Sequence, residues 1–412
     1  MTQEQPARRT VADTAPGAGA SGGAERNPRP RRRRGVRATA VAGAVAVAVA
    51  LGIVVSQTIS GGSGNGGDRG HGRAPGGLPA TDVLAHPDQS PPRDLIAAGR
   101  TAVSAYFTGR TVRRANGDGA VTYAWSLLDT TSGRYRPTAW AWLDVAPGMR
   151  TAAVLERGLP VNRIGLLNLA THEVERWITV DRGVGGVRFS PDGTRLVATA
   201  YRLDPDGLFK DASRRVNDRT VPGPRPSRTG FHVIDVASGR ADFTERPPRS
   251  QGRGFAGGGG RQDLHWSRDG ALLWEPWDSA AGKVFYTVDG TEVPAPERQA
   301  ALRRPGAALS PDGKHVTGKF AGDGGRIVSE VLDAGSGERA ALVPGQQLLA
   351  WADDDALIAW SCDPERCDPG RGEFRNRLVL AGMDGGSPTP LSGFREGDLR
   401  HSGRWTPVFS RR

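Results

Sequence analysis

The sequence predicts an all-β fold made of repeated four-stranded sheets, and three observations support this prediction. Glycine and proline contribute 58 and 30 of the 412 residues, a composition that disfavours long helices. A short turn motif recurs in three well-formed copies, which begin at Ser190, Ser267 and Ser310. A second series of turns lies between these copies, so each repeating unit contains two hairpins.

The first turn motif places Ser-Pro-Asp-Gly, or a close variant, between two apolar strands. Its well-formed copies span residues 187–198, 264–273 and 308–316, and degenerate copies span 142–148 and 350–358. Proline presets the first central position, aspartate accepts backbone N–H groups two residues on, and glycine supplies a positive φ. The Asp-Gly pairs are Asp192 and Gly193, Asp269 and Gly270, and Asp312 and Gly313. We interpret these six residues as structural turn residues; the alternative is a cation site at which the three carboxylates meet.

The second series of turns follows an apolar strand and usually ends in glycine. Its six copies span residues 127–133, 166–172, 233–239, 285–290, 331–337 and 379–385. Two hairpins per unit give about four antiparallel strands, which is the blade of a β-propeller. Six outer turns favour a six-bladed β-propeller, with seven blades as the alternative. We expect residues 404–409 to form a strand that closes the ring beside the first blade, because closure removes exposed sheet edges.

The repeated unit, with its apolar residue, Ser-Pro-Asp-Gly and second apolar strand, resembles the repeat of TolB-like and WD-repeat-like bacterial propellers. It is also similar to the repeat in the propeller domain of prolyl oligopeptidase relatives. The resemblance covers about residues 100–412. The Gly-His and Trp-Asp signatures of eukaryotic WD repeats are missing. The resemblance therefore implies a β-propeller architecture. It does not imply that this chain binds the partners of eukaryotic WD repeats.

The first 67 residues differ sharply in composition from the repeats. Residues 1–37 hold nine arginines against three acidic residues, and residues 38–67 contain no charged residue. The apolar run over 38–55 is about 27 Å long as a helix, which is sufficient to cross a bilayer with snorkelling ends. Arginines are retained on the cytoplasmic side, so the C-terminal part is expected outside the cytoplasm. The alternative is a cleaved signal peptide, which also exports the C-terminal part.

We therefore predict four segments. They are a disordered basic cytoplasmic tail over 1–37, a transmembrane helix over 38–59, a flexible Gly/Pro-rich linker over 60–93, and the propeller over 94–412, with an insertion at about 203–230. The arginine tail invites a nucleic-acid interpretation, but the apolar run that follows makes membrane orientation its first role, and no nucleic-acid partner is expected.

The chemistry-bearing residues favour a protein without catalytic residues, cofactor or metal. Cys362 and Cys367 are expected to form a small disulfide loop in an exported domain; a metal site needs further ligands, and no histidine lies nearby in sequence. Residues 19–23 match the nucleophile-elbow pattern and residues 252–257 match the dinucleotide pattern, but neither has the required strand and helix around it. The seven histidines include no pair at metal-binding spacing.

Two features are candidates for partner binding. The insertion carries the arginines Arg214, Arg215, Arg219, Arg225 and Arg228. Residues 202–228 contain seven basic and four acidic residues in total. It is either a tolerated surface loop or an arm for an anionic surface such as a cell-wall polymer or an acidic protein. Trp274 and Trp277 either pack between blades or line a pocket on which a carbohydrate or peptide stacks.

The leading functional hypothesis is a membrane-anchored, extracytoplasmic and monomeric β-propeller that acts as a non-enzymatic protein-binding or scaffolding module. The second hypothesis is an extracytoplasmic ligand or glycan sensor that signals through the membrane helix. The third is a hydrolase with its site in the propeller channel, which would assemble a Ser–His–Asp set from several blades.

Overall fold

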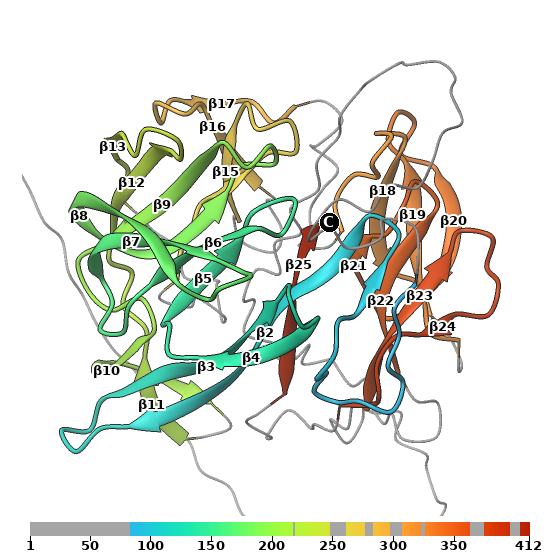
Figure 1. Ribbon diagram of the computed structural model, residues 1–412, viewed down its shortest axis with the longest axis horizontal. Coiled ribbons are helices and arrows are strands. Elements are labelled where there is room, and N and C mark those ends of the chain that lie inside the picture. The colour runs from blue at the N-terminus through green and yellow to red at the C-terminus, as the bar shows by residue number, and fades with distance from the viewer. Residues whose placement is uncertain are drawn as a thin grey trace, which may run out of the picture. The chain divides into compact units, whose positions relative to one another are not determined.

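A computed structural model describes residues 83–216, 219–247, 261–276, 283–296, 307–322, 326–362, 375–395 and 404–412 (Figure 1). The described residues form strands and turns without a helix, which confirms the predicted all-β class for this part of the chain. No helix among the described residues has the length and apolarity needed to span a bilayer. The predicted tail and transmembrane helix lie outside the described residues, as does the predicted linker up to residue 82.

The first sheet contains both the earliest and the last described strands. Its members are β1 (Ala97–Ala98), β2 (Thr101–Arg113), β3 (Gly119–Asp129), β4 (Arg134–Thr138), β10 (Gly207–Val216), β11 (Arg219–Gly223) and β25 (Trp405–Arg411). β25 pairs antiparallel with β2, from Thr101 opposite Arg411 to Thr108 opposite Trp405. The expected pairing of the C-terminal strand with the first sheet is therefore confirmed, and it covers an edge that would otherwise be open.

The second sheet is an antiparallel meander of seven strands. They are β5 (Trp142–Val145), β6 (Thr151–Leu155), β7 (Val161–Asn168), β8 (Val174–Phe189), β9 (Arg195–Tyr201), β12 (Arg228–Asp235) and β13 (Ala241–Glu245). The long strand β8 pairs mainly through residues 174–179 with β7 and through residues 184–189 with β9. Two four-stranded units therefore share one continuous strand.

Three smaller antiparallel sheets complete the described fold. The third sheet has β14 (His265–Trp266), β15 (Leu273–Pro276), β16 (Lys283–Tyr286) and β17 (Glu292–Val293). The fourth has β18 (His315–Phe320), β19 (Val328–Asp333) and β20 (Arg339–Pro344), with an isolated bridge between Leu309 and Val316. The fifth has β21 (Gln347–Trp351), β22 (Ala356–Cys362), β23 (Asn376–Gly382) and β24 (Thr389–Pro390).

The three Ser-Pro-Asp-Gly-type turns share one local hydrogen-bond network. In each, the serine hydroxyl donates to the aspartate at 2.5–2.6 Å, as Ser190 does to Asp192. The same carboxylate accepts a backbone N–H from two residues on at 3.0 Å. Gly193, Gly270 and Gly313 have φ values of 74°, 69° and 77°, which glycine adopts without strain. Asp192, Asp269 and Asp312 thus act within their own turns.

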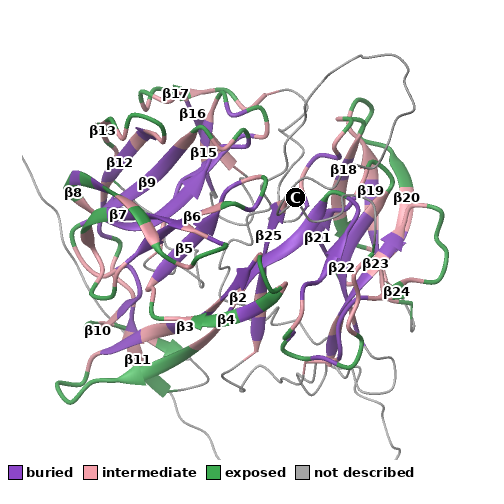
Figure 2. Ribbon diagram, viewed as in Figure 1, coloured by how far each residue is buried: buried purple, intermediate pink, exposed green. Residues whose placement is uncertain are grey.

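The buried core consists of apolar side chains from these sheets. Figure 2 shows that many of the strands carry buried residues. The largest cluster draws residues from the first, second and fifth sheets, and includes Trp125, Trp360 and Trp405. Trp360 and Trp405 meet edge to face with centroids 5.2 Å apart, so the last sheet packs directly against the closing strand. Separate antiparallel sheets packed side by side and closed by the C-terminal strand fit a propeller-like fold.

Candidate functional site

The predicted insertion forms a hairpin, β10–β11, that joins the first sheet. Gly207 and Leu208 of β10 pair with Ala120 and Gly119 of β3. The N–H of Val121 also donates to the carbonyl of Asp206 at 2.9 Å. Strands β2, β3, β10 and β11 therefore lie in one sheet. We call residues 108–124 and 203–225, excluding 217 and 218, the annex sheet.

The annex sheet presents cationic side chains to solvent. Its exposed basic residues are Arg110, Arg113, Arg114, Lys210, Arg215 and Arg219, and Arg225 is half-buried. Arg114 lies 3.6 Å from Asp204, and Arg225 pairs with Asp211 across the hairpin while its guanidinium covers the Phe209 ring. Basic residues outnumber the acidic ones on this sheet, so it carries a net positive charge. Figure 2 shows exposed and half-buried residues along these strands, in contrast to the buried interior.

The five arginines singled out in the insertion do not share one environment. Arg215 and Arg219 are exposed, and Arg214 and Arg225 are half-buried. Arg228, at the start of β12, is instead among the most buried side chains of the structure. Its guanidinium pairs with Glu275 of β15 and donates to backbone carbonyls, including that of Arg246 at 3.0 Å. Arg228 therefore ties the second sheet to the third and is not available to a partner.

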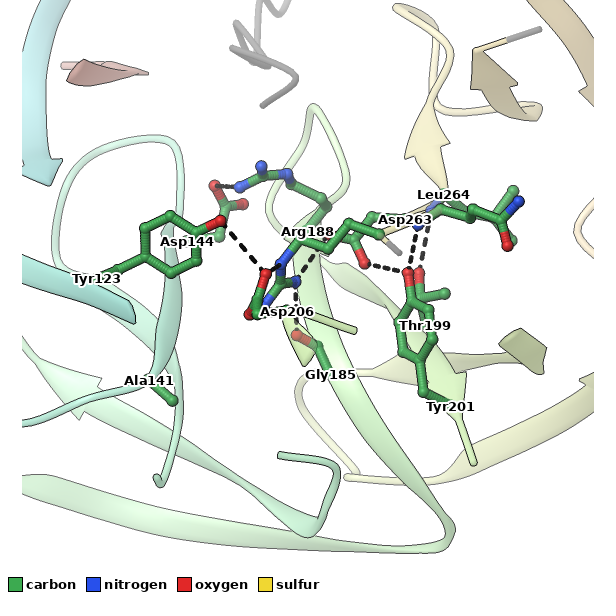
Figure 3. Close-up of polar contacts among 12 residues, drawn as sticks. Tyr123, Ala141, Asp144, Gly185, Arg188, Thr199, Tyr201, Asp206, Asp263 and Leu264 are labelled. Carbon is green, nitrogen blue, oxygen red and sulfur yellow. Dashed lines mark hydrogen bonds and ion pairs between the residues drawn. The ribbon is translucent and has the colours of Figure 1, made fainter. Parts of the chain in front are cut away.

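A buried polar cluster lies at the root of the annex sheet (Figure 3). At its centre Arg261 donates two hydrogen bonds to Asp206, from Nε to Oδ1 at 2.7 Å and from Nη2 to Oδ2 at 2.6 Å. Nη1 donates to the carbonyl of Gly185 at 2.7 Å and to Asp263 at 3.1 Å. The guanidinium also lies over the Trp142 ring, 3.5 Å from its centroid. One side chain therefore joins the insertion to three other segments.

Tyrosine hydroxyls complete this cluster. Tyr123 of β3 donates to Asp206 at 3.3 Å, and Tyr201 of β9 donates to Asp263 at 2.8 Å. The N–H of Gln262 in turn donates to the Tyr201 hydroxyl at 2.7 Å. Gly186 is needed for the close approach of Asp263, because a Cβ atom there would lie 2.3 Å from its Oδ1. We call Arg261, Asp206, Asp263, Tyr123 and Tyr201 the clamp.

Beside the clamp lies a second buried ion pair. Arg188 of β8 donates to Asp144 of β5 at 3.2 Å, and the N–H of Phe189 donates to the other carboxylate oxygen at 2.8 Å. The side chains of Arg188 and Asp144 are 7% and 2% exposed. Because such charges are costly to bury alone, the pair fixes the relation between β5 and β8.

The electrostatics of the clamp agree with a structural role. Burial raises the pKa of Asp206, and the Arg261 guanidinium partly offsets this effect. Burial also opposes the ionisation of Asp263, but Arg261 and the Tyr201 hydroxyl together lower its pKa below the usual value. Burial and the neighbouring Asp263 charge raise the pKa of Tyr201 well above its usual value. Each of these groups is engaged with a partner, so the clamp positions the annex sheet and has no group poised to react.

The remaining predicted site residues lie apart from the annex sheet. Trp274 is half-buried, donates from Nε1 to the Trp266 carbonyl at 2.9 Å, and has its ring beside His265 and 4.0 Å from the Lys283 ammonium. Trp277 lies outside the described residues. Cys362 is buried and disulfide-bonded, while Cys367 lies outside the described residues. Within the described ranges, no group of His, Cys, Asp and Glu side chains is arranged to hold a metal ion.

Sequence reasoning did not single out the clamp. Asp206 lies in the Asp-Pro-Asp-Gly segment 204–207 of the insertion, and this composition is typical of a turn. Arg261 follows a glycine run and carries no motif. Its importance arises from contact with Asp206, 55 residues away in sequence, and no local pattern signals that contact.

No model of a known protein family matches the sequence, and no curated protein matches it. Among solved structures the chain is similar to TolB from Acinetobacter baumannii, at 15% identity over 75% of this chain and 67% of that one, with a TM-score of 0.38. It is also similar to hydrazine synthase from Kuenenia stuttgartiensis, at 13% identity over 64% of this chain and 68% of that one, with a TM-score of 0.31. At these scores the propeller-like assignment rests on the strand pairing of the chain itself.

Proposed function

We propose that this chain is a membrane-anchored, extracytoplasmic six-bladed β-propeller that acts as a non-enzymatic protein-binding module, with the annex sheet as its docking surface. The partner is an acidic protein surface. The observation that carries the proposal is the exposed basic sheet held at its root by the buried clamp.

The strand pairing supports six blades. The first consists of β25, β2, β3 and β4, the second of β5 to β7 with the first half of β8, and the third of the second half of β8 with β9, β12 and β13. The third, fourth and fifth sheets supply one blade each. In this arrangement the closing strand β25 shares a blade with β2, β3 and β4.

The proposed location follows from the sequence ahead of the propeller. Nine arginines within residues 1–37, followed by the uncharged run over 38–67, favour a helix with its N-terminus in the cytoplasm. Export of the folded part agrees with the disulfide at Cys362, because disulfides persist in oxidising compartments.

The physical properties of the annex sheet favour protein binding over a tolerated loop. A free loop loses conformational entropy when it binds, whereas a paired hairpin with a clamped root is already ordered. Exposed arginines also increase the rate of association with an acidic partner, and they disfavour the binding of cationic proteins. The hairpin itself depends on Gly223, where a Cβ atom would lie 2.1 Å from the Ala212 carbonyl oxygen. Its conformation is therefore specified locally as well as at the root.

The test compares two triple variants of the full chain, purified from solubilised membranes. In the annex variant, Arg113, Arg215 and Arg219 become glutamine. In the matched control, Arg150, Arg157 and Arg240, which are also exposed, become glutamine. Quantitative mass spectrometry identifies co-purifying acidic proteins, and binding is then measured with each purified partner. We expect the annex variant to bind at least tenfold more weakly than the parent chain, with a shallower dependence of affinity on salt. The control should keep the affinity and the salt dependence of the parent chain. Equal binding by both variants would refute the proposal.

A further inference from the structure

Three side chains lie in a row at one end of the fifth sheet. Cys362 of β22 is opposite Asn376 of β23, and Asn376 forms an antiparallel bridge with Arg395. The N–H of Arg395 donates to the Asn376 carbonyl at 2.7 Å. Residues directly opposite each other in antiparallel pairs project to the same face, with Cβ atoms about 5 Å apart. The amide of Asn376 and the side chain of Arg395 therefore share one face of the sheet.

Asn376 is completely buried, and its side chain has no partner. Its exposed fraction is 0%, and neither Oδ1 nor Nδ2 has a hydrogen-bond partner. Buried amides in folded proteins are nearly always hydrogen-bonded, because burial removes the water that would otherwise satisfy them. An amide that is buried without a partner calls for an explanation other than packing, since an apolar side chain of similar size would fill this position without that cost.

Arg395 lies beside it and stacks on an aromatic ring. Its guanidinium covers the Trp360 ring, 3.6 Å from the centroid, and Nη1 donates to the Trp405 carbonyl at 2.7 Å. Nε is buried and has no hydrogen-bond partner, and no carboxylate of the described ranges pairs with this guanidinium. Burial lowers the pKa of Arg395 well below its usual value, and the like charge of Arg404 adds to this effect. This end of the fifth sheet thus holds a cation whose charge is not neutralised by the described residues.

We propose that Asn376 and Arg395 form a binding site for a carboxylate with an apolar body, at the junction between the fifth sheet and the closing strand β25. The planar guanidinium offers its Nε edge to a carboxylate, a geometry that a compact ammonium does not provide. Nδ2 of Asn376 supplies a further donor. The Trp360 ring stacks on the guanidinium and meets the Trp405 ring edge to face, and these rings favour an apolar group next to the carboxylate. This site is distinct from the annex sheet, so each proposal stands or fails alone.

The test follows thermal unfolding of the full chain at constant ionic strength, with phenylacetate or with phenylacetamide, its neutral analogue. A ligand that binds only the folded state raises Tm. We expect phenylacetate at millimolar concentration to raise Tm by about 3 °C and phenylacetamide to raise it by less than about 1 °C. The variant Arg395→Gln should lose the response. Equal shifts with both compounds, or an unchanged response in Arg395→Gln, would overturn the proposal.

A second variant keeps the test decisive even if Arg395→Gln does not fold. Asn376→Asp places a carboxylate on the face that Arg395 occupies and so supplies an internal counter-ion. We expect it to unfold at a higher temperature than the parent chain and to show no change in Tm with phenylacetate. The matched control is Asn162→Asp, which makes the same change at an exposed position. A Tm for Asn376→Asp at or below that of the control would contradict the proposal.

Discussion

Replacing His265 by phenylalanine should remove a large part of the acid sensitivity of the fold. His265 of β14 is 4% exposed, its Nδ1 has no hydrogen-bond partner, and its ring stacks beside Trp274 at 4.5 Å. Burial lowers the pKa of His265 from 6.5 to about 3, and the charge of Arg188 adds to the effect while Asp263 opposes it. The folded chain therefore keeps this imidazole neutral at pH values where the unfolded chain protonates it.

The sign and size of the effect follow from this difference. Below pH 6.5 the unfolded state binds a proton that the folded state does not bind until about pH 3, so stability is lost as the pH falls through this window. At pH 5 the contribution is about 2 kcal/mol, from 1.5 pH units at about 1.4 kcal/mol per unit. Phenylalanine preserves the stacking and does not titrate. His265→Phe should therefore lose about 2 kcal/mol less than the parent chain between pH 7.5 and pH 5.

Urea unfolding followed by tryptophan fluorescence at both pH values gives the four free energies required. His265→Gln serves as a second variant, because it packs differently but also lacks a titrating group. Both variants should show the same reduced pH dependence even if their absolute stabilities differ. Equal losses of free energy on acidification in the parent chain and in both variants would refute the reasoning.

Three further predictions concern the clamp and the disulfide. Arg261→Gln leaves Asp206 and Asp263 buried without their cation and should lower the free energy of unfolding by about 3–5 kcal/mol in urea titrations; a loss below about 1 kcal/mol would contradict the assigned role. Gly186→Ala forces a Cβ atom against the Asp263 carboxylate and should cost about 1–3 kcal/mol by the same measurement, whereas unchanged stability would exclude that contact. Thiol titration of the denatured, unreduced full chain should find no free thiol, since Cys362 is disulfide-bonded; two free thiols would contradict this.

The local part of the fold could be predicted because its determinants are short. The turn at Asp192 is specified by four consecutive residues, and the same four-residue logic recurs at Asp269 and Asp312. The closing strand was predictable because a ring of sheets leaves one edge that the C-terminus can cover, and β25 does pair with β2. These features depend on backbone conformation and on the alternation of apolar residues, which the sequence displays directly.

The site was less predictable because its determinants are contacts between distant segments. Counting charges in the insertion treats Arg225 and Arg228 alike, yet the Arg225 side chain is 42% exposed and the Arg228 side chain is buried against Glu275. These two arginines are three residues apart in sequence, and the difference arises because the hairpin ends at Gly223 and β12 begins at Arg228. Arg261 illustrates the same limit, because its structural role depends on its hydrogen bonds to both Asp206 and Asp263. Composition indicates a basic arm, and only packing decides which of its residues face solvent.

The clamp also permits a test of why charges rather than apolar side chains hold the annex sheet. If Arg261→Gln is costly because it leaves uncompensated buried carboxylates, then neutralising those carboxylates should recover stability. The triple variant Arg261→Gln, Asp206→Asn and Asp263→Asn keeps the side chains at similar size and leaves no buried charge within the clamp. It should regain at least half of the free energy lost by Arg261→Gln alone, because the pairing of buried ions contributes little net stability compared with the cost of breaking it. Recovery of stability together with weaker partner binding would show that the ion pairs specify the placement of the hairpin; no recovery would show that the hydrogen bonds of Arg261 themselves stabilise the fold.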